Sequence, residues 1–210
     1  LAGEYLHASG LVFKNGYTPS SAVIEFRRNK TDLAYHSQVS EMVIDNYSNP
    51  NKTESDYWVA LYGKHNRFDH NHLTGKRNKG VTVAVRLNGE AHQENHHSID
   101  HNYFGYRPVF GSNGGETLRI GTSHFSREYS NTTAQYNYFD RTNGEHEIIS
   151  NKSSGNSLLN NVFFEQSKAN LLKESHSELD RIAKFLNQSP SLGIVLEGHT
   201  DIEGSPAQNM

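Results

Sequence analysis

Short runs of apolar and β-branched residues recur along the first 160 residues, and they are separated by glycine, asparagine and serine. Clear examples lie at 22–26 (AVIEF), 81–85 (VTVAV) and 147–149 (EII). Such runs between turn residues indicate β-strands. Helical periodicity is weak before residue 170, so this region is predicted to be mainly β.

A degenerate repeat also crosses this region, in which a polar pair precedes an asparagine and an apolar residue follows shortly after it. Its asparagines are 25, 31, 35 and 24 residues apart. Coils of this length predict a parallel β-helix in which stacked asparagines hydrogen-bond to the backbone and to each other. The alternative is an antiparallel β-sandwich with asparagines in ordinary turns, and the repeat favours the β-helix. The repeat asparagines are Asn46, Asn71, Asn102, Asn137 and Asn161.

The pattern changes near residue 165. A capping box at 175–178 (SHSE) precedes apolar residues at helical spacing, and Pro190 ends the segment. Residues 193–197 (GIVLE) then resemble a strand. We therefore predict two regions, a partial β-helix over 1–160 and a short C-terminal α/β segment over 161–210.

Composition excludes several functional classes. The chain of 210 residues contains no cysteine, so disulfides and thiolate chemistry are excluded. No apolar run is long enough for a transmembrane helix. A formal net charge of −3 argues against general nucleic-acid binding.

Candidate chemistry is concentrated at 112–123 (SNGGETLRIGTS) and 144–153 (GEHEIISNKS). Glu145 and Glu147 would share one face of a strand, where two carboxylates repel each other unless a cation lies between them. Asn113 and Glu116 offer further oxygen atoms from a neighbouring coil. Ligands that are all oxygen suit Ca²⁺ better than Zn²⁺ or Cu²⁺. The simpler alternative is a solvated acidic face.

Two cations accompany these carboxylates. Lys152 follows a predicted turn at 150–151 and could act as a general base, because a bound cation and Arg119 would favour its neutral form. The alternative is an ordinary surface lysine. Arg119 could hold a substrate carboxylate, or it could instead form an ion pair with one of the glutamates.

Residues 1–160 resemble polysaccharide lyase family 6, which includes alginate lyases and chondroitinase B. The resemblance rests on 58–63 (WVALYG), 75–80 (GKRNKG), 101–105 (HNYFG), 113–116 (NGGE) and 145–153 (EHEIISNKS). It implies a right-handed parallel β-helix and Ca²⁺-dependent β-elimination on an acidic, uronate-containing polysaccharide such as alginate or chondroitin/dermatan sulfate.

By motif match, the resemblance also assigns roles to individual residues. Lys152 would take the proton at C5 of the uronate, and Arg119 would bind substrate. In the family, a Leu-Arg-His-Gly motif about twenty residues after the lysine supplies the general acid, but residues 171–174 read LLKE here. We therefore expect impaired activity. The implied Ca²⁺ ligands are Asn113, Glu116, Glu145 and Glu147.

Residues 161–210 resemble the start of an OmpA-like peptidoglycan-binding domain, through 162–164 (VFF), 179–182 (LDRI) and 198–205 (GHTDIEGS). This resemblance implies that Asp201 binds peptidoglycan. Two functions are thus predicted: a lyase on acidic polysaccharide or, alternatively, a cell-envelope protein that binds peptidoglycan. Both imply a bacterial protein that is periplasmic, associated with the outer membrane, or secreted.

Overall fold

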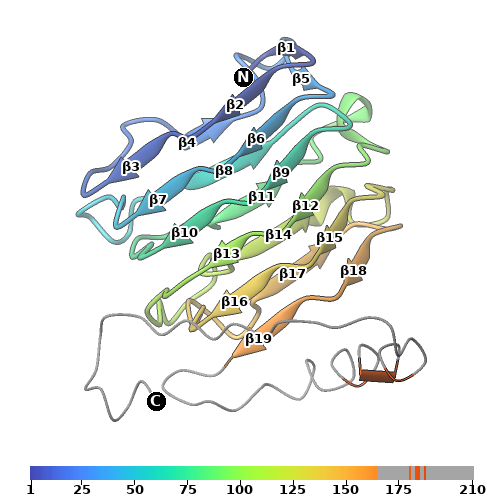
Figure 1. Cartoon of the computed structure of the whole chain (residues 1–210). Helices are drawn as coiled ribbons and strands as arrows, with labels where there is room; N and C mark the ends of the chain where they lie inside the picture. The colour runs from blue at the N-terminus through green and yellow to red at the C-terminus, as the bar shows by residue number, and fades with distance from the viewer. Residues whose placement is uncertain (165–179, 181–182, 185–186, 188–210) are drawn as a thin grey trace.

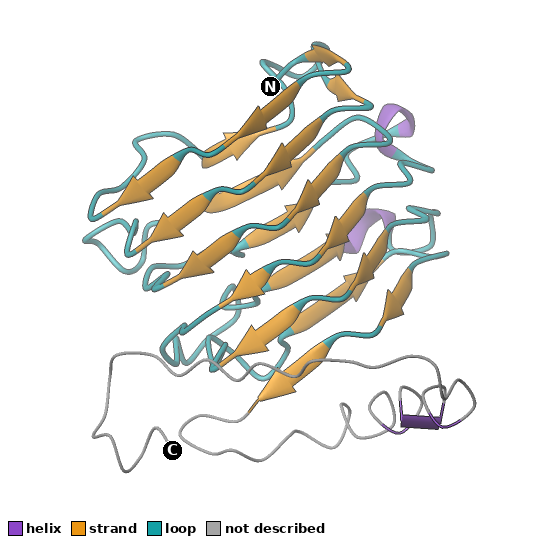
Figure 2. Ribbon diagram, viewed as in Figure 1, coloured by secondary structure: helices purple, strands orange, loops and turns teal. Residues whose placement is uncertain are grey.

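The computed structural model describes residues 1–164 and, beyond them, residues 180, 183, 184 and 187. Strands β2 to β4 and β6 to β19 stack into three parallel sheets, so that each coil of the chain adds one strand to each sheet (Figures 1 and 2). This is the parallel β-helix that the repeat predicted, with about five turns, and the sandwich alternative is wrong. Two short strands, β1 (Gly3–Glu4) and β5 (Ala34–Tyr35), pair beside the first coils.

Sheet 1 and sheet 2 are built from short strands whose middle residues point into the core. In sheet 1 the strands are β2 (His7–Ser9), β6 (Gln38–Ser40), β9 (Arg67–Asp69), β12 (Ser98–Asp100), β15 (Thr133–Gln135) and β18 (Ser157–Leu159). In sheet 2 they are β3 (Val12–Lys14), β7 (Val43–Asp45), β10 (His72–Thr74), β13 (Tyr103–Phe104), β16 (Tyr138–Asp140) and β19 (Val162–Phe164).

Sheet 3 has the longest strands and carries the predicted catalytic side. Its strands are β4 (Ala22–Glu25), β8 (Tyr57–Leu61), β11 (Val83–Val85), β14 (Leu118–Gly121) and β17 (Ile149–Lys152). Two single-turn 3₁₀ helices, η1 (Glu90–His92) and η2 (Ser123–Phe125), lie in the loops that lead from sheet 3 back to sheet 1.

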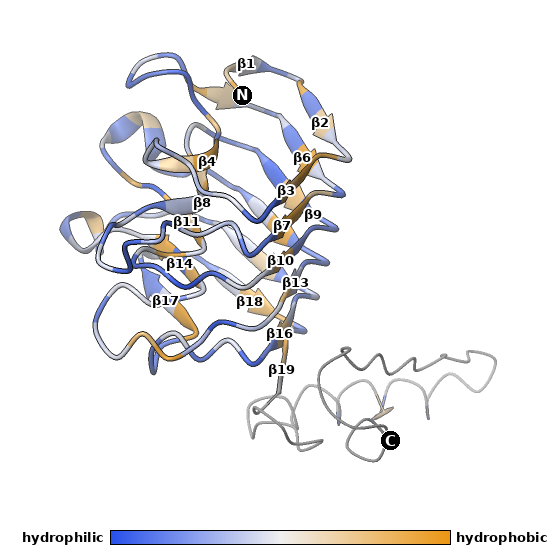
Figure 3. Ribbon diagram, turned by 90° about the vertical axis from the view of Figure 1, so that its left-hand side faces the viewer, coloured by the Kyte–Doolittle hydropathy of each residue, from blue (hydrophilic) through white to orange (hydrophobic). Residues whose placement is uncertain are grey.

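The core is a column of side chains that run along the axis. Phe68, Ile99, Phe104 and Phe139 are fully buried, and the rings of Phe104, Phe139 and Phe163 stack on successive coils. Figure 3 shows hydrophilic loops joining strands that carry the hydrophobic positions. The alternation of inward apolar and outward polar residues therefore specifies the sheets.

The corner between sheet 1 and sheet 2 is the same on every coil. A residue with positive φ comes first, and the next residue faces the neighbouring coils. Asn71, Asn102, Asn137 and Asn161 occupy this second position and form a ladder. The Oδ1 atoms of Asn102, Asn137 and Asn161 each accept the backbone N–H and the side-chain amide of the asparagine one coil earlier, at 2.9 to 3.1 Å. Oδ1 of Asn71 accepts the backbone N–H of Met42 at 2.9 Å.

One member of the predicted repeat is wrong. Asn46 lies after β7, whereas Met42 occupies the ladder position, because Val43 pairs with His72 and so places Met42 beside Asn71. The sequence around Asn46 resembles the repeat, but Asn46 follows the C-terminal end of β7, whereas the ladder position precedes the strand.

The solenoid continues through β19 to Phe164, four residues past the predicted boundary at 160. Beyond it, Asp180, Ala183, Lys184 and Asn187 are helical and exposed. The predicted strand at 193–197 and Asp201 lie outside the described residues, so the second region stays a prediction. In the described part of the chain, no helix is long and apolar enough to cross a membrane.

Candidate active site

The predicted site residues gather on two neighbouring coils, at the corner between sheet 2 and sheet 3. Asn113 and Glu116 lie in the loop from β13 to β14, and Glu145 and Glu147 lie in the loop from β16 to β17. Because β14 pairs in parallel with β17, these loops lie side by side. Arg119 follows on β14, and Lys152 ends β17.

Two glycines bring these loops into direct backbone contact. A Cβ added at Gly115 would lie 2.5 Å from the carbonyl oxygen of Gly144, and one added at Gly144 would lie 2.1 Å from the carbonyl oxygen of Gly115. Real Cβ atoms do not approach so closely, so only glycine fits at both positions. The close approach places the carboxylates that follow each glycine together.

Three carboxylates converge at this contact. One oxygen from each of Glu116, Glu145 and Glu147 lies within 4.8 Å of the others. Glu116 is fully buried, Glu145 is half-buried and Glu147 is exposed. The Oε2 atom of Glu145 accepts the backbone N–H groups of Gly114 and Gly115, both at 2.8 Å. The cluster is therefore held by the loops themselves.

The buried carboxylate of Glu116 is only partly satisfied. Its Oε1 atom accepts a hydrogen bond from Nε of Arg119 at 2.9 Å, and a second guanidinium nitrogen also contacts this oxygen. Its Oε2 atom is buried without a hydrogen-bond partner among the described residues. A buried, unpaired carboxylate oxygen is costly unless a cation binds it. The donor set contains only oxygen, which fits Ca²⁺.

Lys152 stands beside this cluster. Its Nζ atom lies 3.8 Å from Oε1 of Glu116, and its side chain is 28% exposed. Asn113, Arg119 and Lys152 line one groove of about 360 Å³. The fold thus brings together all six predicted lyase-site residues: a carboxylate cluster with a neighbouring amide, an amine and a guanidinium, next to a groove.

Two expectations about local structure are wrong. Glu145 and Glu147 do not lie on a strand, because β17 begins only at Ile149. The carboxylates converge because the preceding loop bends and Glu145 turns toward the amides of the adjacent coil. The predicted turn at 150–151 is also wrong, since Ser150 and Asn151 pair with β14.

The ion-pair alternative for Arg119 agrees with the geometry, since its guanidinium contacts Glu116. Tyr57 and Lys79 also line the groove, and the sequence motifs assigned no role to either of them. Lys79 belongs to the segment 75–80 that carries the family resemblance, so a signal existed for it. Arg107, which is buried near the start of the loop from β13 to β14, had no such signal.

This combination of fold and site defines a class: a parallel β-helix with an acidic, oxygen-rich cluster and a lysine on one side. A family model described as chondroitinase B matches residues 1–184. The chain belongs to this family.

Solved structures of polysaccharide lyases resemble the chain closely. AlyGC, an alginate lyase of family PL6, is 69% identical, with a TM-score of 0.78 over 79% of this chain and 23% of that chain. A mannuronic acid-specific family 6 lyase from human gut microbiota is 39% identical, with a TM-score of 0.74 over 77% of this chain and 38% of that chain.

A third structure, the PL6 polysaccharide lyase Pedsa3628 from Pseudopedobacter saltans, is 26% identical, with a TM-score of 0.64 over 76% of this chain and 38% of that chain. The chain thus spans 23% to 38% of the length of these three relatives. No curated protein matches it significantly. The comparisons give no support to the OmpA-like resemblance of 161–210.

Proposed function

We propose that this chain carries the metal and base half of a lyase that cleaves uronate-containing polysaccharide by β-elimination. One observation carries the proposal: three carboxylates within 4.8 Å stand beside a lysine and an arginine, and one of them has a buried oxygen that lacks a partner in the described part of the chain. The identity with a known alginate lyase favours alginate over chondroitin or dermatan sulfate as substrate. A periplasmic or secreted location would expose the enzyme to such polymers.

Ca²⁺ is the cofactor that fits the donor set, and Asn113, Glu116, Glu145 and Glu147 would hold it. When bound, it would neutralise the uronate carboxylate and so make the adjacent C–H more acidic. The loops need little rearrangement for this role, because Glu145 is already fixed by two backbone amides.

The residues of this chain would then act on the substrate directly. The amine of Lys152 accepts the proton from C5 of the uronate, the C4–O bond breaks, and a double bond forms between C4 and C5. Arg119 on the same groove binds the acidic substrate. No water enters the reaction, and the product is an unsaturated uronate.

The leaving oxygen needs a proton, and the expected donor is absent. The stretch that corresponds to the family's Leu-Arg-His-Gly motif, residues 171–174, reads LLKE, so the arginine and the histidine are both absent and Lys173 is the only cationic side chain in this stretch. These four residues lie outside the described residues. A lysine lacks the planar fork of arginine. We therefore expect this chain to bind Ca²⁺ and polysaccharide but to turn over slowly.

The test is the absorbance of the unsaturated uronate after incubation with alginate, with and without a chelator. Lys152→Ala should lose at least about 100-fold in rate, the usual contribution of a positioned base. Lys30→Ala, an exposed lysine in another loop, is the matched control and should keep wild-type activity. Activity that survives Lys152→Ala would remove this lysine from the mechanism.

Calorimetry tests the metal site independently of turnover. Wild-type protein should take up Ca²⁺, and Glu145→Gln should bind it much more weakly. Uptake without turnover would support the assignment and locate the defect in the missing acid. Absence of any Ca²⁺ uptake would contradict the proposed site.

A further inference from the structure

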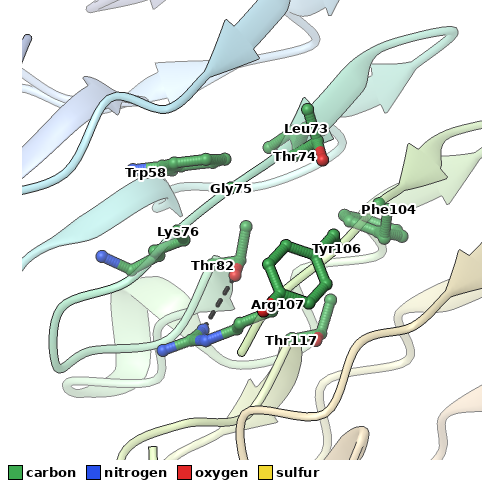
Figure 4. Close-up of a pocket in the computed structure, with 11 residues that line it drawn as sticks. Trp58, Leu73, Thr74, Gly75, Lys76, Thr82, Phe104, Tyr106, Arg107 and Thr117 are labelled. Atoms are coloured by element: carbon green, nitrogen blue, oxygen red, sulfur yellow. Dashed lines mark hydrogen bonds between the residues drawn. The ribbon is translucent and has the colours of Figure 1, made fainter. Parts of the chain in front are cut away.

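Arg107 is a buried cation behind the candidate site, in the loop from β13 to β14, and is only 3% exposed. Its guanidinium donates to the Thr82 hydroxyl at 2.9 Å and to the carbonyl oxygens of Gly80 at 2.7 Å and Glu116 at 2.9 Å. Figure 4 shows its side chain reaching toward Thr82. Within the described part of the chain, none of its hydrogen-bond partners is a carboxylate.

These bonds fix the backbone that carries the carboxylates. The carbonyl oxygens of Gly114, at a longer 3.4 Å, and of Glu116 accept from Arg107. Between them lies Gly115, and the N–H groups of Gly114 and Gly115 hold the carboxylate of Glu145. One side chain therefore fixes the loop from behind while the loop's amides hold Glu145 in front.

The contacts of the Arg107 guanidinium, which we call the clamp, span three coils. Gly80 belongs to the preceding coil, and Gly144 belongs to the following one. A Cβ at Gly144 would lie only 2.7 Å from Nε of Arg107, so the next loop packs directly against the guanidinium. The fork of arginine offers five donors in a rigid plane, which a lysine cannot reproduce.

Electrostatics support the same role. Burial lowers the pKa of Arg107 to about 10, while Glu116, Glu145 and Asp56 act to raise it, so the guanidinium stays charged at neutral pH. Its positive charge offsets the repulsion among the carboxylates without occupying Oε2 of Glu116. That oxygen remains available to a cation.

We propose that Arg107 is a positioning residue that presets the 113–116 loop for cation binding. The inference rests on the proposed function for the identity of the bound ion. Residues that orient metal ligands typically change affinity 10- to 100-fold when they are replaced.

The decisive variant is Arg107→Lys, which keeps the charge and removes the fork. We expect its Ca²⁺ affinity, measured by calorimetry, to fall about 10-fold or more. In metal-free protein, the amide hydrogens of Gly114 and Gly115 should exchange faster than in the wild type, because the loop loses its clamp. Arg27→Lys is the matched control, since Arg27 stacks on Tyr62 and pairs with Glu25 away from this loop.

A second, milder variant keeps the inference testable if Arg107→Lys does not fold. Thr82→Val removes one acceptor of the Arg107 fork and should change both readouts in the same direction by a smaller amount. Unchanged amide exchange at Gly114 and Gly115 in folded Arg107→Lys would overturn the inference, whether or not the protein binds Ca²⁺. Equal effects from Arg27→Lys would overturn it as well. If the wild type bound no Ca²⁺, the proposed metal site would fail, and amide exchange would still decide whether Arg107 clamps the loop.

Discussion

The two ends of each sheet 2 strand meet opposite requirements. At the N-terminal end, the corner from sheet 1 contains two residues on every coil, with the same positive φ and, from Asn71 onward, the same asparagine. At the C-terminal end, the loops to sheet 3 differ in length and sequence from coil to coil. The candidate site lies in two of these loops.

The contrast shows how a repetitive fold separates stability from chemistry. The corner between sheet 1 and sheet 2, which contains the asparagines, repeats one set of hydrogen bonds and sets the register of each new coil. The corner between sheet 2 and sheet 3, here called the loop corner, can then contain like charges, a half-satisfied carboxylate and close glycine contacts, because the asparagine corner holds the coils together. The following predictions test this division.

The largest effect should come from the ladder. Asn102→Ala removes the acceptor for both amides of Asn71 and the donor to the carbonyl of Phe68. Several buried polar groups would lose their partners, at about 1–3 kcal/mol each, so the free energy of unfolding should fall by about 3–5 kcal/mol. Denaturant unfolding measures this change, with exposed Asn88→Ala as the near-neutral control. A loss below about 1 kcal/mol would contradict the importance of the ladder.

A second effect concerns His97, which occupies the corner from sheet 3 to sheet 1. Its Nδ1 accepts the N–H of Asn66, and burial lowers its pKa to about 3. The unfolded chain, with a pKa near 6.5 for this group, binds the proton more readily. Stability is therefore fully present above about pH 6.5 and is lost as the pH falls toward 3, by roughly 1 kcal/mol per pH unit.

His97→Asn removes this titration and supplies the residue type found at the equivalent Asn66 and Asn156 positions. His65, His92 and His96 lie nearby and remain in the variant. Unfolding free energies measured from pH 7 to pH 4 should therefore fall less steeply in the variant than in the wild type. Parallel curves would show that His97 does not cause the acid sensitivity.

A smaller effect is expected at the positive-φ position of the repeating corner. Glu41 is exposed with φ of 56°, and Gly10 takes the same place on the first coil with φ of 72°. Because the left-handed conformation is strained for residues other than glycine, Glu41→Gly should gain about 0.5–1 kcal/mol and Gly10→Ala should lose a similar amount. Thermal unfolding of both variants would show whether the corner imposes this conformation.

The smallest change in stability should occur at the loop corner. Glu147→Gln alters an exposed member of the carboxylate cluster, so metal-free unfolding should change by less than about 0.5 kcal/mol. Ca²⁺ should raise the melting temperature of the wild type more than that of the variant. Equal stabilisation of both proteins by Ca²⁺ would exclude Glu147 as a ligand.

Much of the fold was predictable because its rules are local. Alternating apolar positions and recurring asparagines indicated a parallel β-helix, and the structure confirms it. The pattern failed at Asn46, since a sequence repeat does not show at which end of a strand a residue lies. Likewise, the prediction that Glu145 lies on a strand was wrong. The loop bends there because Glu145 binds amides from another coil, and the local sequence does not reveal those amides.

The candidate site divides in the same way. Glu116, Glu145, Glu147 and Lys152 were named from two short segments and from the family resemblance. The structure gathers the three carboxylates and places Lys152, which lines the groove, beside Glu116. Tyr57 and Lys79 were assigned no role, although they line it. A groove is formed by side chains from several coils, and no single segment encodes its outline.

The sequence by itself determined the type of secondary structure, the length of the coils and the chemical groups available, because these depend on neighbouring residues along the chain. Only the tertiary structure decided which groups meet. The contact of Gly115 with Gly144 and the hydrogen bond from Arg107 to Gly80 both join different coils. Stacking of the coils fixes these contacts, and residues some thirty positions apart become neighbours through sheet pairing alone.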